Sequence, residues 1–164
     1  MGPASAASAS ADLLLYDVQN KSLRPWLATD AEEAHARFSP DGKWVAYASN
    51  VSGQFEIYIR PFDGGESTMV STAGGEQPIW RRDSELFYLE PGDDVMAVSL
   101  VRSRDSISPG KPQRLFRIPL NDITRTAVAP YDVSPDGQRF LLNVPDSPAP
   151  LFFLQGLEGL IARK

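Results

Sequence analysis

A short pattern of strand, turn and strand occurs three times in this chain and limits the folds that it can adopt. Each copy joins an apolar strand to a second strand through a turn containing aspartate. The turn aspartates lie 42 and then 53 residues apart, a spacing typical of repeat proteins built from one four-stranded unit per period. The copies are ARFSPDGKWVAYAS at 36–49, PIWRRDSELFYLE at 78–90 and YDVSPDGQRFLLN at 131–143, with Asp41, Asp83 and Asp136 in their turns.

The composition excludes several classes of protein. The 164 residues are 42% hydrophobic and 23% charged, which is enough apolar material for one globular domain. The net charge of −5 and the scattered basic residues argue against a nucleic-acid partner. No run of 18 apolar residues occurs, so we expect no insertion into a membrane. The absence of cysteine excludes disulfides and thiolate metal sites and leaves the compartment open.

The chain between its two ends reads as strands. Apolar clusters of four to eight residues alternate with turn residues, and no helical stripe appears before the last ten positions. The sequence therefore predicts an all-β protein. The expected strands are 12–18, 23–28, 34–38, 43–49, 54–60, 66–72, 77–80, 85–90, 94–101, 112–118, 128–133, 138–144 and 150–155.

The two ends are expected to lie outside this core. Residues 1–11 are rich in Ala and Ser and lack the charged and Leu-rich regions of a secretion signal, so they predict a flexible tail, natural or left over from cloning. Residues 156–164 are predicted to be a tail or a short helix whose basic residues lie at its C-terminal end. The expected domain covers 12–155.

The turns support hairpins. In Ser-Pro-Asp-Gly at 39–42 and 134–137, Pro presets φ, Asp can bond to the nearby backbone and Gly can take the positive φ that closes the turn. The middle copy has Ser84 in place of glycine and is one residue shorter, so its turn must differ. Asp63-Gly64-Gly65 separates two further strands in the same manner.

Alternation along each copy places apolar side chains on common faces, which need a neighbouring sheet to cover them. Phe38, Trp80 and Val133 occupy equivalent positions, and packing between sheets explains them better than a ligand cage. The pairs that share a face are Val45 with Tyr47, Leu86 with Tyr88, and Phe140 with Leu142.

The pattern of Ser-Pro-Asp-Gly, an apolar strand, FEIYIRPFDGG and a Gly-Gly before the next copy resembles the TolB-type repeat. Such repeats form TolB-like six-bladed β-propellers, the propellers of prolyl-oligopeptidase relatives and the C-terminal sensor propellers of bacterial membrane-anchored serine/threonine kinases. The segments GGEQPIWRRDSELFYLE and APYDVSPDGQRFLLNVP resemble the kinase-associated type most. The resemblance implies an extracytoplasmic or periplasmic location.

Mapped onto this chain, the resemblance implies two complete blades, at 34–72 and 77–118, with the inner strands near 36–38, 78–80 and 131–133. The segment 12–28 would then be the outer half of a preceding blade, and 128–155 the inner part of a following one. These parts make about three of the six blades that a ring requires.

An open arc of three blades would expose apolar faces at its ends. The sequence therefore predicts a homodimer in which two copies complete each other's split blades and close a six-bladed ring. Missing blades on another chain, or removed from this one, are the alternative. In the dimer, strand 150–155 is surplus.

Signs of catalysis are few. His35 is the single histidine, and no G-x-S-x-G sequence presents a nucleophile. We interpret His35 as a strand-edge or channel-lining residue. The acidic residues Asp30, Glu32, Glu33, Asp93 and Asp94 lack the spacing of a calcium loop, and we interpret them as solvated turns. The sequence thus predicts no enzyme activity, no catalytic, cofactor-binding or metal-binding residues, and no cofactor.

Three functions of different classes remain. A non-enzymatic binding and assembly module would present its channel and loops to a peptide, a protein or a small ligand, and the sequence favours this one. A substrate-gating propeller of a prolyl-oligopeptidase-like hydrolase and a sensor fragment of a receptor kinase are the alternatives. Attached domains in the full-length sequence would separate them.

Overall fold

The computed structural model describes residues 11–82, 84–103, 106–120 and 130–144, and every regular element in them is a β-strand. The predicted strand 150–155, the C-terminal segment 156–164, Asp83 and all of the predicted tail except Ala11 lie outside the described residues. The described strands are β1 (Leu13–Asp17), β2 (Ser22–Leu27), β3 (Glu33–Phe38), β4 (Trp44–Ser49), β5 (Glu56–Pro61), β6 (Thr68–Met69), β7 (Glu76–Arg81), β8 (Glu85–Glu90), β9 (Asp94–Arg102), β10 (Ile107–Pro109), β11 (Gln113–Arg117), β12 (Tyr131–Val133) and β13 (Phe140–Leu142).

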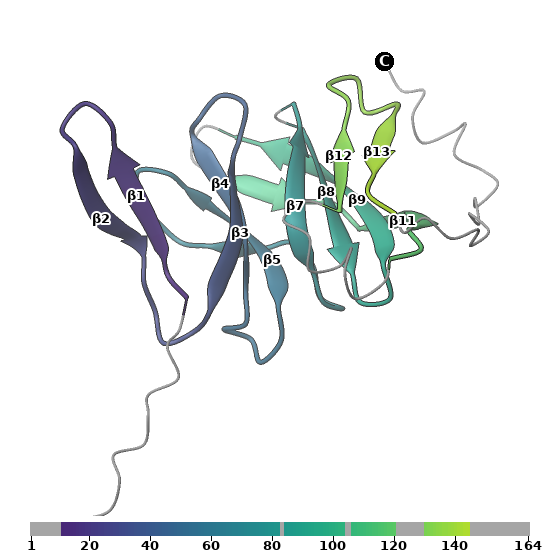
Figure 1. Ribbon diagram of the computed structural model, residues 1–164, viewed down its shortest axis with the longest axis horizontal. Helices are drawn as coiled ribbons and strands as arrows, with labels where there is room; N and C mark the ends of the chain where they lie inside the picture. The colour runs from purple at the N-terminus through teal and green to yellow at the C-terminus, as the bar shows by residue number, and fades with distance from the viewer. Residues whose placement is uncertain (1–10, 83, 104–105, 121–129, 145–164) are drawn as a thin grey trace, which may run out of the picture.

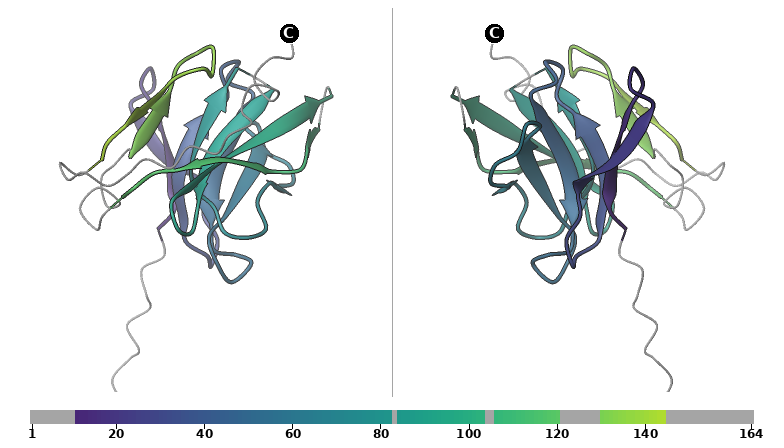
Figure 2. Two further views of the ribbon diagram at one scale, coloured as in Figure 1. Left: turned by 90° about the vertical axis from the view of Figure 1, so that its right-hand side faces the viewer. Right: turned by 90° about the vertical axis from the view of Figure 1, so that its left-hand side faces the viewer.

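Two complete propeller blades form the middle of the molecule. Strands β3, β4, β5 and β6 pair antiparallel in chain order, and β7, β8 and β9 do the same in the next sheet. Figure 1 shows the sheets side by side in chain order, and the end views of Figure 2 show them one behind another. The first strands β3 and β7 contact each other, as inner strands of neighbouring blades do. The predicted all-β propeller blades at 34–72 and 77–118 are confirmed.

The fourth strand of the second blade is broken in two, which the sequence prediction missed. Both β10 and β11 pair with β9, β10 along its C-terminal part and β11 along its N-terminal part. Between them the Gly110 N–H still donates to the Ser99 carbonyl, at 2.7 Å. Pro112 has no N–H to continue the ladder, so the strand bulges at this point. In the first blade the fourth strand is shorter than predicted and covers only β6.

A two-stranded hairpin lies at each end of the arc. The hairpin of β1 and β2 is at one end of Figure 1, and the hairpin of β12 and β13 is at the other. Contacts of β1 with β3 repeat the contacts of β5 with β7. Since β5 is the third strand of its blade, β1 occupies a third-strand position, and β1 and β2 are the outer half of a blade. Strands β12 and β13 occupy first and second positions, as predicted.

Apolar layers between the sheets hold the arc together. One core lies between the two complete blades, and a second lies between the β7–β11 blade and the last hairpin. Burying so many apolar side chains is the main favourable term for the fold. The first core includes Trp44, Ala46, Ala48, Ile57, Ile59, Val70, Leu86, Tyr88, Met96, Val98, Leu100 and Ile107; the second includes Phe87, Leu89, Val95, Ala97, Leu115, Phe116, Ile118 and Tyr131.

The predicted common faces are confirmed, and each points at the preceding unit. Leu86 and Tyr88 belong to the core shared with the first blade. Phe140 and Leu142 pack on the core of the second blade. Tyr47 meets Trp26 of the first hairpin edge to face, with ring centroids 6.1 Å apart. The middle turn is one residue shorter, but the strands on either side of it pair equivalently in all three copies. Phe38 pairs with Val45, Trp80 with Leu86, and Val133 with Phe140.

The first hairpin is anchored to its blade by the Trp26 side chain. Its indole N–H donates to the Phe62 carbonyl at 2.9 Å, and its ring stacks on the Phe62 ring. The Arg60 guanidinium lies 5.8 Å from the Trp26 ring centroid, within the range of a cation–π interaction. Contacts of Trp26 with Phe62 and Arg60 therefore hold the hairpin against the first complete blade.

Each of the two Ser-Pro-Asp-Gly turns is closed by the same set of hydrogen bonds. The Ser39 hydroxyl donates to Asp41 at 2.6 Å and accepts from the Trp44 N–H. Asp41 also accepts from the Lys43 N–H, while the Gly42 N–H donates to the Ser39 carbonyl. The second turn repeats each of these bonds with Ser134, Asp136, Gly137, Gln138 and Arg139.

The two glycines of these turns have the expected positive φ, +71° at Gly42 and +68° at Gly137. In the shorter middle turn Arg82 takes the left-handed conformation instead, with φ +49°. Nothing lies within 4 Å of a Cβ added at Gly42, whereas at Gly137 it would meet the Arg81 side chain. The two glycines therefore differ in their surroundings but share the same backbone requirement.

Replacing Gly42 with valine should lower the free energy of unfolding by about 1–3 kcal/mol, because a β-branched residue is strained at positive φ. Ser84→Val is the matched control and should cost less, since in that turn Arg82 takes the left-handed conformation. Urea unfolding of both variants measures the difference. An equal loss at the two positions would contradict this account of the turns.

Asp41 also links the two blades. Its carboxylate accepts from Arg102 of β9 at 2.7 Å. Partial burial favours the neutral form, but the bonds from Ser39, Lys43 and Arg102 outweigh it and lower the pKa of Asp41 from 3.8 to about 2. The turn of one blade is thereby tied to the end of the next.

Because the folded pKa of Asp41 lies below its ordinary value, its stabilising effect is complete above about pH 4 and is lost as the pH falls towards 2. Asp41→Asn should therefore destabilise the protein at pH 7, and the gap to the parent should shrink between pH 4 and 2. Asp63→Asn, in another exposed turn, is the control. Urea midpoints over this pH range test it, and a gap that is constant with pH would refute it.

Candidate functional site

A pocket opens between the two complete blades, at the lower face in Figure 1. We use "lower face" for the β4–β5 turn (50–55), the segment 70–75 ahead of β7 and the β8–β9 turn (91–93). The pocket has a volume of about 250 Å³. Its lining residues are Gln54, Phe55, Gly74, Gly75, Glu76, Gln77, Leu89, Glu90, Pro91, Asp93 and Leu120.

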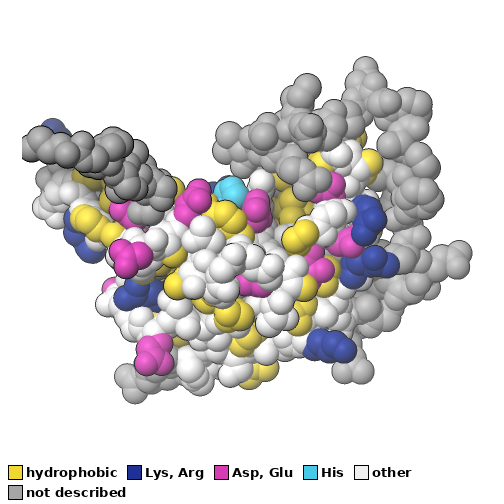
Figure 3. Space-filling model, turned by 90° about the horizontal axis from the view of Figure 1, so that it is seen from below, with side chains coloured by type: hydrophobic (Ala, Val, Ile, Leu, Met, Phe, Trp, Pro, Cys, Tyr) yellow, Lys and Arg dark blue, Asp and Glu magenta, His cyan; other side chains and the backbone are white. Residues whose placement is uncertain are grey.

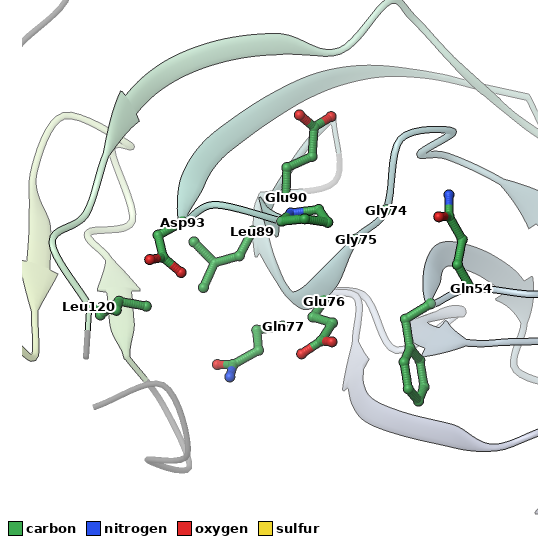
Figure 4. Close-up of a pocket in the computed structure, with 11 residues that line it drawn as sticks. Gln54, Gly74, Gly75, Glu76, Gln77, Leu89, Glu90, Asp93 and Leu120 are labelled. Carbon is green, nitrogen blue, oxygen red and sulfur yellow. The ribbon is translucent and has the colours of Figure 1, made fainter. Parts of the chain in front are cut away.

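Polar and apolar groups converge on this pocket from both blades. In Figure 4 the Glu76 and Gln77 side chains project side by side from the start of β7, with Asp93 and Leu89 beside them. The Glu90 carboxylate points the opposite way in this view, as does Gln54. The site therefore has acidic groups on two sides of an apolar wall. An amine or a guanidinium is the complementary group.

The inner strands are bulged where they enter this face. The register shifts between Ala34 and Arg37 in β3 and between Glu76 and Ile79 in β7. His35 and Gln77 lie at the same position of the two bulges and have φ of +56° and +54°. A non-glycine residue in this region costs about 1–3 kcal/mol, and such strain is concentrated at functional sites. Each bulge thus changes the direction of one side chain, His35 in the first blade and Gln77 in the second.

His35 lies on this lower face, where Figure 3 shows acidic side chains gathered beside the histidine. Desolvation lowers the pKa of His35, Glu76 acts in the opposite direction and Arg37 lowers it further. His35 lies in the bulge of the inner strand β3, and its interpretation as a strand-edge or channel-lining residue stays a prediction. The imidazole favours its neutral form.

Glu90, which also lines the pocket, lies near further carboxylates. Desolvation, together with the charges of Asp94 and Glu56, raises the pKa of Glu90. Tyr88 lies near the same carboxylates; its buried hydroxyl has no hydrogen-bond partner, and desolvation raises its pKa. Glu56 itself is buried and accepts bonds from the Ser71 hydroxyl and the Gly74 N–H. Glu56, Glu90 and Asp94 thus place three carboxylates near one another on β5, β8 and β9, and Arg114 and Arg117 pair with Asp94.

The interpretation of the acidic residues as solvated turns is wrong for three of the five. Glu33 is 3% exposed, and Asp93 and Asp94 are also buried. Glu33 accepts from the Thr29 hydroxyl at 2.6 Å. Asp94 accepts two bonds from Arg117, at 2.9 and 2.8 Å, which lower its pKa. These partners could not be identified from local sequence. Asp30 and Glu32 are exposed as predicted.

The equivalent inner-strand residues Phe38, Trp80 and Val133 differ in their surroundings. Trp80 and Val133 pack on the two cores, as predicted. Phe38 is 54% exposed and touches Phe62, with ring centroids 5.2 Å apart. Within the described residues no group of three or more His, Asp or Glu side chains could hold a metal ion. No helix among them could cross a membrane.

Comparisons with known proteins agree with a propeller. The profile of the dipeptidyl peptidase IV (DPP IV) N-terminal region matches residues 5–85, just under half of the chain. A curated relative, the uncharacterized peptidase YuxL of Bacillus subtilis (strain 168), is 27% identical over 81 residues. That match covers 48% of this chain and 12% of the relative, so the similarity spans a small part of the longer protein.

A solved structure described as TolB, from Agrobacterium tumefaciens, is similar with 17% identity and a TM-score of 0.48. The similarity covers 63% of this chain and 42% of that chain. The assignment of β-propeller blades rests on the sheets and cores described above.

Proposed function

We propose that this chain is a non-enzymatic β-propeller module that assembles into a ring and presents its lower face to a positively charged peptide. The pocket between the blades carries this proposal. Among the described residues that line it, Glu76, Glu90 and Asp93 are acidic and none is basic. A cationic group bound there would gain Coulomb energy in a site partly shielded from solvent.

A peptide fits the chemistry of the lining. Gln77 offers an amide group that can pair with a peptide backbone, and Phe55, Leu89 and Pro91 offer an apolar wall for a side chain. A peptide that carries a lysine or a free amino terminus would use both kinds of group.

A second candidate is the substrate-gating propeller of a peptidase. The match to the DPP IV N-terminal region and the similarity to a curated peptidase favour it. In that role the same pocket would receive a peptide substrate for a catalytic domain on the same protein. The alternative that the chain is a sensor fragment of a receptor kinase rests on the sequence resemblance alone.

The binding proposal predicts charge-selective recognition. A lysine-rich hexapeptide should bind more tightly than its glutamate counterpart, and added salt should weaken it. Glu76→Gln should weaken binding about two- to fivefold, the size of a single partly exposed ion pair, and Glu90→Gln, whose carboxylate points away from Glu76, should weaken it less. Glu66→Gln, in the β5–β6 turn, is the control. Calorimetry that gives equal affinities for both peptides would reject the proposal.

The non-enzymatic proposal predicts no turnover of ester, peptide or nucleotide substrates by this chain. His35 would then act only as a lining residue, and His35→Ala would leave the absence of activity unchanged. Chromogenic substrate assays at pH 6 to 9 test this. Turnover that disappears in His35→Ala would show that the chain is an enzyme after all.

A further inference from the structure

The two end hairpins have complementary positions in a blade. Strands β12 and β13 occupy the first and second positions, and β1 and β2 occupy the third and fourth. Within the described residues, β13 pairs only with β12 and β1 only with β2. Each hairpin thus leaves open the edge that the other would fill. The hairpins lie at opposite ends of the arc, so one chain cannot join its own (Figure 1).

The complete blades give the register that such a pairing would take. In the first blade Ala46 of β4 lies opposite Ile59 of β5. Val45 pairs with Phe38 in the way that Phe140 pairs with Val133, so Leu141 is equivalent to Ala46. The segments EIYIR at 56–60 and DLLLY at 12–16 align residue for residue, so Leu15 is equivalent to Ile59. Leu141 is therefore expected opposite Leu15.

The surfaces on both sides of this junction are apolar and incompletely covered. Leu141 is 77% exposed. A cavity of about 100 Å³ lies between the first hairpin and β3, where Phe38 is also exposed. At the intact interface the equivalent of this cavity is closed, because Ala46 packs in one core with Leu86 and Trp80. The cavity is lined by Leu13, Leu14, Leu15, Trp26, Ala36, Arg37, Phe38, Val45 and Phe62.

We propose that a second copy of this chain occupies this surface. Strand β13 of one copy pairs antiparallel with β1 of the other, and Leu141 lies opposite Leu15 of the second copy and against its Phe38. The inference rests on the assembly part of the proposed function and names its interface. Applied twice about a two-fold axis, the pairing completes two split blades, gives six blades in total and covers the β13 and β1 edges that a single copy leaves open.

Cysteine cross-linking tests the register, since the chain has no cysteine of its own. Leu15→Cys and Leu141→Cys proteins are prepared separately and then mixed under mild oxidation. Directly opposed strand residues are close enough for a disulfide. We expect cross-linked dimers in the mixture and none in either protein alone. Val101→Cys, at a site that is 71% exposed on β9, is the control partner for Leu15→Cys and should give none.

Light scattering tests the assembly itself. The parent should have twice the 18.0 kDa chain mass at micromolar concentration. Leu141→Asp should weaken the dimer at least tenfold, and Val101→Asp, which is similarly exposed, should not. A monomer at every concentration would overturn both the interface and the assembly part of the proposed function. A dimer without the expected cross-link would overturn the interface alone, and peptide binding is measured independently of both.

Discussion

Packing of one sheet face on the next is the constraint on which this structure depends. The middle strands β8 and β9 have apolar side chains on both faces, so a single blade cannot bury them and needs a neighbour on each side. The core between the complete blades shows the solution, with Trp44 and Ile57 from one sheet meeting Leu86 and Met96 from the other. Stability therefore comes from interfaces between repeats, and it is weakest wherever an interface is incomplete.

The lower face is a consequence of this packing. The inner strands β3 and β7 contact each other, and residues of the β4–β5 turn, the segment ahead of β7 and the β8–β9 turn line the pocket between the blades. Buried polar pairs hold those turns in place: Glu56 binds Ser71 and the backbone of Gly74, and Asp94 binds Arg117. These carboxylates are occupied by partners, whereas Glu76 and Gln77, at the bulge of β7, line the pocket.

The fold could be predicted from the sequence to the extent that its causes are local. The bonds that close the first Ser-Pro-Asp-Gly turn all lie within residues 39–44. The alternation of side chains along 86–88 depends only on the two-residue period of a strand. The site could not be predicted in the same way. Nothing near Asp94 in the sequence indicates Arg117, 23 residues on, and nothing in EAHAR indicates the bulge at His35. The division of the fourth strand into β10 and β11 could likewise not be predicted, because Ser and Pro residues in the segment 103–112 do not show a strand pattern.

The two complete blades repeat the same bulge in their inner strands but place different residues in it. The register makes Glu33 equivalent to Gly75 and His35 equivalent to Gln77. At one interface the bulge therefore presents an imidazole behind a buried carboxylate, and at the next it presents an amide beside a glycine that packs against Ser71 and Ile57. The strands on either side of the two bulges keep the same register although these residues differ. Binding specificity in such a chain can change at the bulges without loss of the packing that holds the blades together.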